Sequence, residues 1–361
     1  MKKWGLLGLA LALTLTTACA NGTTTDTAAE GDDGAEGETT TATAGGSRLD
    51  AVLERGQLIC GVDGGIPGFS FVDESGAYSG LDVDVCRAVA AALFDDPDAI
   101  EYRRLDSTER FTALSGGEVD MLSRNTTWTI SRDTQVGMEF APTTFYDGQG
   151  MMVREASGIA GLEDFAGRAV CVETGTTTEL NLTDQMRKLG VEFEPVVFQD
   201  ADAAYAAYDE GRCEGMTSDK SQLIARRSTL PTPEEHVLLE VTMSKEPLGP
   251  LTVNNDSAWF DVVKWVTYGL IQAEEFGITS ENIEEFAGSE DPNIARFLGE
   301  EGTLGDDMGI PNDFMARAIR NVGNYGEIYE TNLGSESQFE LDRGLNALWT
   351  EGGLLYAPPF R

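Results

Sequence analysis

Apolar residues are spaced along the chain in a pattern that occurs twice. In the first occurrence, short apolar runs of strand length alternate with segments whose apolar residues recur at helical spacing. The second helical segment opens on a capping pattern, Asp106 with Glu109, and ends at Gly116 and Gly117. The pattern predicts five elements in the order strand, helix, strand, helix, strand: 58–62, 81–94, 100–105, 106–116 and 119–122.

The same order returns further along the chain: 169–172, 178–189, 195–198, 201–210 and 214–217. Two such units indicate two α/β lobes. Two extended segments that contain Gly and Pro lie before and after the second unit, at 140–153 and 241–253. They would carry the chain from the first lobe to the second lobe and back. Two crossings predict a hinge, after which an amphipathic helix at 259–276 would help to complete the first lobe.

The composition excludes several classes of function. Asp and Glu number 62 against 25 Lys and Arg, a formal net charge of −37, so nucleic-acid phosphates and anionic lipids would be repelled. The sequence has one histidine, His236, which excludes multi-histidine metal sites, and it has no phosphate-binding glycine loop. We therefore expect no nucleic-acid partner, no metal and no cofactor.

The N-terminus has the features of an export signal. A basic start precedes an apolar run at 4–15, too short to span a membrane, and small residues lead to Cys19. We favour lipidation of Cys19 as a membrane anchor; the alternative is cleavage after Ala20, which would remove the thiol. Residues 20–47 are rich in Thr, Ala, Gly, Asp and Glu, a composition that predicts a disordered linker.

These patterns divide the chain into five parts. We expect a signal peptide, a linker, the first part of lobe 1, lobe 2, and a segment that completes lobe 1 and adds C-terminal helices: 1–19, 20–47, 48–145, 146–247 and 248–361. The signal and linker carry few of the charges, so the acidity belongs to the surface of the lobes, where it favours solubility.

Polar, Gly-rich loops follow the strands expected at 58–62, 119–122, 169–172 and 214–217. In open parallel sheets, ligands bind beyond the carboxyl ends of the strands. The loops offer hydroxyls, backbone N–H groups, an arginine and several acids to one cleft. Such a cleft suits a small zwitterion.

The same loops carry a resemblance that extends over nearly all of the chain from Arg48 onward. Its most specific segments are 80–86, 123–132, 147–150, 174–182, 245–250 and 356–359. In these segments the chain resembles the extracytoplasmic substrate-binding proteins of polar or general L-amino-acid ABC importers, bacterial solute-binding protein family 3. The resemblance implies an α/β fold of the type II periplasmic-binding-protein class, two βαβαβ-based lobes joined by a two-strand hinge. It also implies a monomer that binds L-amino acids outside the cell membrane, delivers them to an ABC permease and is not an enzyme.

The resemblance assigns roles to particular residues. Arg132, five residues after Thr127, is expected to hold the α-carboxylate of the ligand, and Asp219 its α-ammonium. Four more residues correspond to further positions of the family's site: Asp63, Asn125, Thr174 and Thr177. Where glutamine- and lysine-type binders place an aromatic residue against the ligand, this chain has Ser107. Since the assigned groups hold what every L-amino acid shares, we expect modest selectivity among side chains.

Three alternatives stay open. A glutamate- or aspartate-specific protein would pair the second carboxylate of its ligand with Arg124 or Arg110. A dehydratase-like enzyme on the same fold would need a cleft acid, for which Asp63, Glu173 and Asp219 are the candidates. A sensor that presents its ligand to a receptor is not separated from a transport protein by the sequence.

Four cysteines follow Cys19, an even number in an exported chain, and they predict two structural disulfides. Cys171 and Cys213 begin the first and third strands of the second unit, which are neighbours in the expected strand order, so we expect them to pair. Cys60 lies in the first strand and Cys86 in the helix packed on it, which predicts the second bridge.

Overall fold

The computed structural model describes residues 46–361. The signal peptide expected at 1–19, the lipidation site at Cys19 and nearly all of the linker expected at 20–47 lie outside these described residues. Within 46–361, no helix has both the length and the apolar character needed to cross a membrane.

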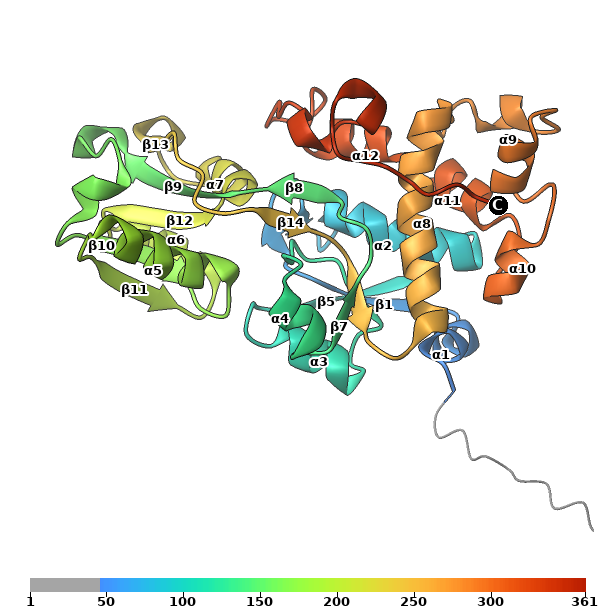
Figure 1. Ribbon diagram of the computed structural model, residues 1–361, viewed down its shortest axis with the longest axis horizontal. Coiled ribbons are helices and arrows are strands. Elements are labelled where there is room, and N and C mark those ends of the chain that lie inside the picture. The colour runs from blue at the N-terminus through green and yellow to red at the C-terminus, as the bar shows by residue number, and fades with distance from the viewer. Residues whose placement is uncertain (1–45) are drawn as a thin grey trace, which may run out of the picture. The chain divides into compact units, whose positions relative to one another are not determined.

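Each of two lobes is built on a five-stranded sheet (Figure 1). The first sheet has the order β5-β1-β6-β15-β7, in which β5, β1 and β6 are parallel and β15 is antiparallel to both of its neighbours. Its strands are β1 (Leu58–Val62), β5 (Ile100–Arg104), β6 (Met121–Leu122), β7 (Met138–Phe140) and β15 (Leu251–Val253). Because β15 comes from far along the chain, the first lobe is completed by the C-terminal third, as the expected hinge requires.

The second sheet has the order β11-β10-β12-β9-β13. Its strands are β9 (Gln149–Arg154), β10 (Ala169–Glu173), β11 (Glu194–Phe198), β12 (Gly215–Asp219) and β13 (His236–Leu238). Three of them are parallel, with β10 between β11 and β12. Strand β9 pairs antiparallel with β12, and β13 pairs antiparallel with β9 at the edge of the sheet. The helices α5 (Thr177–Leu189) and α6 (Ala201–Asp209) connect the parallel strands, so this unit has the predicted βαβαβ order.

Helix α8 (Ser257–Phe276) is the longest helix of the first lobe. The side chain of Asp256 caps its N-terminus and Gly277 ends it in a left-handed conformation. Its predicted apolar stripe, which includes Val262, Val266 and Leu270, is buried in the core beside α2 (Leu81–Phe94). The C-terminal helices α11 (Phe314–Val322) and α12 (Tyr325–Asn332) pack against α8 and α2, so they extend the same core.

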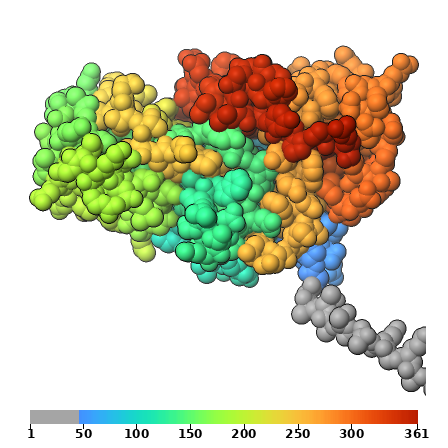
Figure 2. Space-filling view, viewed as in Figure 1, coloured from blue at the N-terminus to red at the C-terminus, as the bar shows by residue number. Residues whose placement is uncertain are grey.

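Two strands connect the lobes. They are β8 (Phe145–Asp147) and β14 (Glu246–Leu248), which pair antiparallel and run side by side in Figure 1. The C-terminal segment braces this pair: the amide oxygen of Asn346 accepts from Tyr146 N at 2.6 Å, and its amide nitrogen donates to Tyr146 O at 3.3 Å. In Figure 2 the light green and yellow residues of the second lobe lie on the left, and the blue, orange and red residues of the first lobe lie toward the middle and right.

Short elements complete the described chain. A small sheet of β2 (Gly65–Ile66), β3 (Ser70–Val72) and β4 (Tyr78–Ser79) follows β1. The sequence pattern did not predict it, because strands of two or three residues are too short to show an alternation. The remaining α-helices are α1 (Arg48–Arg55), α3 (Arg110–Gly116), α4 (Ile130–Thr134), α7 (Lys220–Arg227), α9 (Pro292–Phe297) and α10 (Leu304–Met308).

Both predicted disulfides are confirmed. Cys60 in β1 is bonded to Cys86 in α2, and Cys171 in β10 is bonded to Cys213, which lies just before β12. The first bridge ties a strand to the helix that covers it, and the second ties two neighbouring strands of the second sheet. Each disulfide therefore lies within one lobe and leaves the crossing strands free of covalent links.

Candidate functional site

A pocket of about 330 Å³ lies where the two lobes face each other. It is lined by loops that follow β1 and β6, by the turn into α5 and by the junction of β12 with α7. The structure brings six of the seven residues expected to contact ligand to this pocket: Asp63, Asn125, Thr127, Arg132, Thr177 and Asp219. Thr174 is not among its lining residues, because its hydroxyl donates to Glu179 and its carbonyl accepts from Ser107. We call this cavity the inner pocket.

Arg132 is positioned by the short helix α4, whose N-cap Thr129 accepts from the Arg132 backbone N–H. The guanidinium is buried, lies over the Phe111 ring at 5.3 Å from the ring centroid, and donates from Nη1 to Thr127 O at 2.7 Å. Burial lowers the pKa of Arg132 to about 10, an effect opposed by Glu246 and Asp219. The side chain therefore stays cationic at neutral pH and keeps donors for a ligand oxygen.

Asp219 ends β12 and occupies the N-cap position of α7, yet its side chain makes no capping hydrogen bond. It is 5% exposed, and its Oδ1 atom has no hydrogen-bond partner within residues 46–361. Burial, and then the charges of Asp147 and Glu246, hold the pKa of Asp219 well above the usual range for an aspartate. An unpaired carboxylate oxygen in such a place is costly without a partner, so it is suited to a cationic group of a ligand.

Glu246 in β14 joins hydroxyls from both lobes. Its Oε2 accepts from Thr127 Oγ1 at 2.6 Å and from Thr177 Oγ1 at 2.8 Å, and its Oε1 accepts from Asn181 Nδ2 at 2.8 Å. The side chain is 1% exposed. No sequence pattern assigns a role to Glu246, although it lies in one of the segments that carry the resemblance. Its partners are far away in the sequence, so no local pattern pointed to them.

Asn125 follows β6 with a backbone φ of 29°, a left-handed conformation that asparagine tolerates. Its backbone N–H donates to Asp82 Oδ2 at 2.8 Å, which fixes the loop to the start of α2. Its amide nitrogen donates to Gln222 Oε1 at 3.2 Å in the opposite lobe. Burial raises the pKa of Asp82 to about 7.

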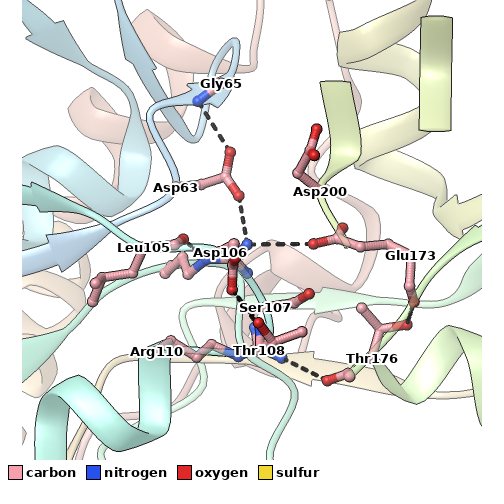
Figure 3. A network of polar contacts seen from close by, with 12 residues as sticks. Asp63, Gly65, Leu105, Asp106, Ser107, Thr108, Arg110, Glu173, Thr176 and Asp200 are labelled. Carbon is pink, nitrogen blue, oxygen red and sulfur yellow. Dashed lines mark hydrogen bonds and ion pairs between the residues drawn. The ribbon is translucent and has the colours of Figure 1, made fainter. Parts of the chain in front are cut away.

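The carboxylates of Asp63 and Glu173 both line the inner pocket, and they point toward each other in Figure 3. Arg124 lies between them: its Nη2 is 2.7 Å from Asp63 Oδ2 and 3.8 Å from Glu173 Oε1, and its Nε donates to Leu105 O at 2.8 Å. Burial raises the pKa of Glu173 despite the neighbouring arginine. Arg124 and Glu173 are buried and Asp63 is mostly covered, so their interactions are little screened by solvent.

A second, larger pocket of about 530 Å³ shares Asp63, Arg124 and Glu173 with the inner one. We call it the outer pocket; it is also lined by Arg104, Asp106, Glu109 and Asp200. Two of these acids already have partners: Asp106 accepts from Glu109 N at 2.9 Å, and Asp200 accepts from Ala203 N at 2.7 Å to cap α6.

Arg110 and Ser107 also connect the lobes near this site. Arg110 is buried over the Phe111 ring, and it donates to Thr126 Oγ1 at 3.3 Å and to Gly175 O at 3.5 Å. Ser107, which the resemblance places where glutamine- and lysine-type binders are expected to have an aromatic residue, donates to Thr174 O at 2.7 Å. Both residues therefore bond the first lobe to the turn that precedes α5.

The arrangement has the chemistry expected for a zwitterion. Thr176 caps one first-turn N–H group of α5, that of Glu179. The other N–H groups of this turn have no intrahelical acceptors and, with the cationic Arg132, favour an anionic group. The unpaired oxygen of Asp219 favours a cationic group in the same pocket.

Comparison with known proteins identifies the family of the chain. The model of the bacterial extracellular solute-binding proteins, family 3, matches residues 58–289. The general L-amino acid-binding periplasmic protein AapJ of Rhizobium johnstonii is 50% identical over 320 residues, 88% of this chain and 94% of that protein. The glutamate/glutamine/aspartate/asparagine-binding protein BztA of Rhodobacter capsulatus is 48% identical, over 88% of this chain and 94% of its own.

Among solved structures, an ABC transporter periplasmic binding protein from Brucella ovis with glutathione bound is 47% identical. It superposes with a TM-score of 0.85, covering 88% of this chain and 100% of its own. A cysteine-binding protein from Campylobacter jejuni, 21% identical with a TM-score of 0.58 over 69% of this chain and 97% of its own, shares the fold.

Proposed function

This chain belongs to the bacterial extracellular solute-binding proteins of family 3, and from that premise we propose that it captures L-amino acids outside the cell membrane and delivers them to an ABC import permease. The observation that carries the proposal is the pairing, in one pocket, of the unpartnered Asp219 carboxylate with the available donors of Arg132.

The family membership confirms the resemblance found in the sequence and the two-lobed α/β fold. The family and the relatives are substrate-binding proteins of ABC transporters, so the chain is not an enzyme. The dehydratase-like alternative is therefore excluded.

We assign the α-carboxylate of the ligand to Arg132 and to the N-terminus of α5 at Thr177. A guanidinium supplies charge-assisted donors, and helix N–H groups without acceptors complete the coordination of the anion. Glu246 accepts from the hydroxyls of Thr127 and Thr177 and so fixes both residues beside the site. The α-ammonium is assigned to Asp219, whose buried oxygen gains the partner that it lacks.

Binding of ligand is proposed to favour closure of the lobes about β8 and β14. A ligand shifts such an equilibrium only by what it gains from groups of both lobes. Arg132 belongs to the first lobe and Asp219 to the second, so one amino acid gains its full set of contacts only when the lobes meet. Hinge closure around a ligand is a general motion of periplasmic binding proteins, and the permease would recognise the closed form.

The site supports broad selectivity better than a glutamate- or aspartate-specific pocket. Arg124 and Arg110, the candidates for a second ligand carboxylate, already have protein partners in Asp63, Leu105, Thr126 and Gly175. Arg124 is ion-paired with Asp63, so it does not require an acidic ligand. Arg110 is bonded only to neutral oxygens and its buried Nε has no partner within residues 46–361, so Arg110 is the group that a second ligand carboxylate would pair.

Thermal unfolding in the presence of each L-amino acid, on protein stripped of ligand by unfolding and refolding, tests the function. We expect several polar and aliphatic amino acids to raise the melting temperature, with affinities within about two decades of one another. Stabilisation by glutamate and aspartate alone would favour the specific alternative, and no stabilisation by any amino acid would refute the proposal.

We also propose that the chain is exported and held at the membrane by lipid on Cys19, with residues 20–47 as the tether. Release of a Cys19→Ala variant into the soluble fraction of cells would support the anchor, and unchanged fractionation would refute it.

A further inference from the structure

The wall shared by the inner and outer pockets holds a donor and an acceptor that the protein leaves incompletely satisfied. Arg124 uses Nε on Leu105 O and Nη2 on Asp63, while its Nη1 makes no hydrogen bond within residues 46–361. Glu173 is 7% exposed, and its Oε1 atom has no hydrogen-bond partner in the same part of the chain. The 3.8 Å between Arg124 Nη2 and Glu173 Oε1 is too long for a hydrogen bond.

Both residues line the inner and the outer pocket, so they lie where the two pockets meet. A ligand side chain that extended from the inner pocket toward the outer one would pass them. An arginine can only donate hydrogen bonds, and an ionised carboxylate can only accept them. A matching ligand group must therefore present one acceptor and one donor side by side. A carboxamide does so, whereas an alkyl group satisfies neither and a carboxylate would place an acceptor against Glu173.

We propose that Arg124 and Glu173 together bind the side-chain carboxamide of a ligand. The amide oxygen accepts from Arg124, and the amide nitrogen donates to Glu173 Oε1. This inference rests on the proposed function, because it places the ligand by its α-groups on Arg132 and Asp219. It makes asparagine or glutamine the preferred ligands within a broad range.

The charges around Glu173 make glutamate and aspartate weaker ligands than glutamine and asparagine. The groups that face it or line the same wall are Arg124, Arg110, Asp63, Asp200, Ser107 and Tyr205. Three acids, Asp63, Asp200 and Glu173, face two arginines, Arg124 and Arg110, so a ligand carboxylate meets surplus negative charge. Because burial raises the pKa of Glu173, the pair accepts a carboxylate by taking up a proton, after which the Glu173 carboxyl donates to the ligand.

The test measures binding of glutamine, asparagine, glutamate and alanine by calorimetry to the refolded protein and to two variants. Glu173→Gln removes the negative charge and adds a donor. We expect it to weaken binding of the preferred amide at least about fivefold and to strengthen glutamate about tenfold, with alanine changed less than about twofold. Glu194→Gln is the matched control, because Glu194 is exposed at the opposite end of the same sheet, paired with Ala169 at the other end of β10 from Glu173.

Opposite changes for amide and acid support the inference, since a structural defect would weaken both. Parallel losses, or unchanged affinities, would overturn it while leaving the proposed function intact. Absence of binding by every amino acid, alanine included, would refute both. Should Glu173→Gln fail to fold, the wild-type protein still decides: in two buffers of different ionisation enthalpy, glutamate should take up about one proton more than glutamine, and equal proton counts would overturn the inference.

Discussion

Among single residues, Arg132 is the one proposed to hold the carboxylate of the amino acid. We predict that Arg132→Ala weakens binding of alanine by a hundredfold or more, about 3 kcal/mol, because a charge-assisted contact in a buried site is lost. Calorimetry on refolded protein measures this. Arg187→Ala is the control, since Arg187 is 77% exposed at the far end of α5 and pairs with Asp184 on the same helix. An unchanged affinity in Arg132→Ala would remove that residue from the site.

The raised pKa of Asp219 predicts how the affinity for an amino acid depends on pH. Its pKa is raised above the usual value by burial and by Asp147 and Glu246. A ligand ammonium favours the ionised carboxylate, so binding releases a proton and affinity should rise as the pH rises from about 5 toward 8. Asp219→Asn should bind alanine more weakly and lose most of this dependence. Wild-type affinity that does not change with pH would contradict the assignment of the ammonium to Asp219.

At the scale of elements, the Cys171–Cys213 bridge closes a loop with a sequence separation of 42 residues and ties β10 to the start of β12. The chain-entropy model gives such a bridge about 4 kcal/mol. We predict that the double variant Cys171→Ala, Cys213→Ala lowers the free energy of unfolding of the second lobe by up to this amount in a urea titration. The same titration with Cys60 and Cys86 intact keeps the first lobe as an internal reference. A change below about 1 kcal/mol would mean that the unfolded chain is little constrained by the bridge.

The elements also explain how much could be predicted from the sequence. Both βαβαβ units followed from hydrophobic periodicity, and α8 from its apolar stripe, because these patterns are local. The strands β2, β3 and β4 are too short to carry a pattern. In the site, Arg132 and Asp219 came from loop positions and a family resemblance. Glu246 did not, because its role depends on Thr127, 119 residues away, and is visible only after the strands cross.

For the molecule as a whole, the raised pKa values of buried aspartates predict that the stability of the fold decreases as the pH rises. Burial raises the pKa of Asp82 to about 7 and the pKa of Asp147 to about 6, from an ordinary value of 3.8. An acid with a higher pKa when folded holds its proton more tightly in the folded state, so its contribution is complete below 3.8 and is lost as the pH rises toward the folded value.

We therefore predict that the ligand-free protein melts at a higher temperature near pH 5 than near pH 7.5, as its net charge of −37 at pH 7 also favours. Asp82→Asn should flatten this profile, with an upper bound of about 4 kcal/mol for its share. Asp73→Asn is a control, because Asp73 is exposed in a turn and its pKa is lowered by hydrogen bonds from Ser75 and Ala77. Differential scanning calorimetry between about pH 5 and pH 7.5 measures the melting temperatures. A wild-type melting temperature that rises with pH would contradict the prediction.

The contact between Asn346 and Tyr146 has a consequence for solubility. A ribbon of only two strands has two open edges, and an open edge is a template on which another chain can add a strand and begin to aggregate. The side-chain amide of Asn346 bonds to both the N–H and the C=O of Tyr146, as a neighbouring strand would. The C-terminal segment thus occupies this position on β8 with a single side chain. The ribbon can bend between the lobes while offering intruding strands one less place to attach.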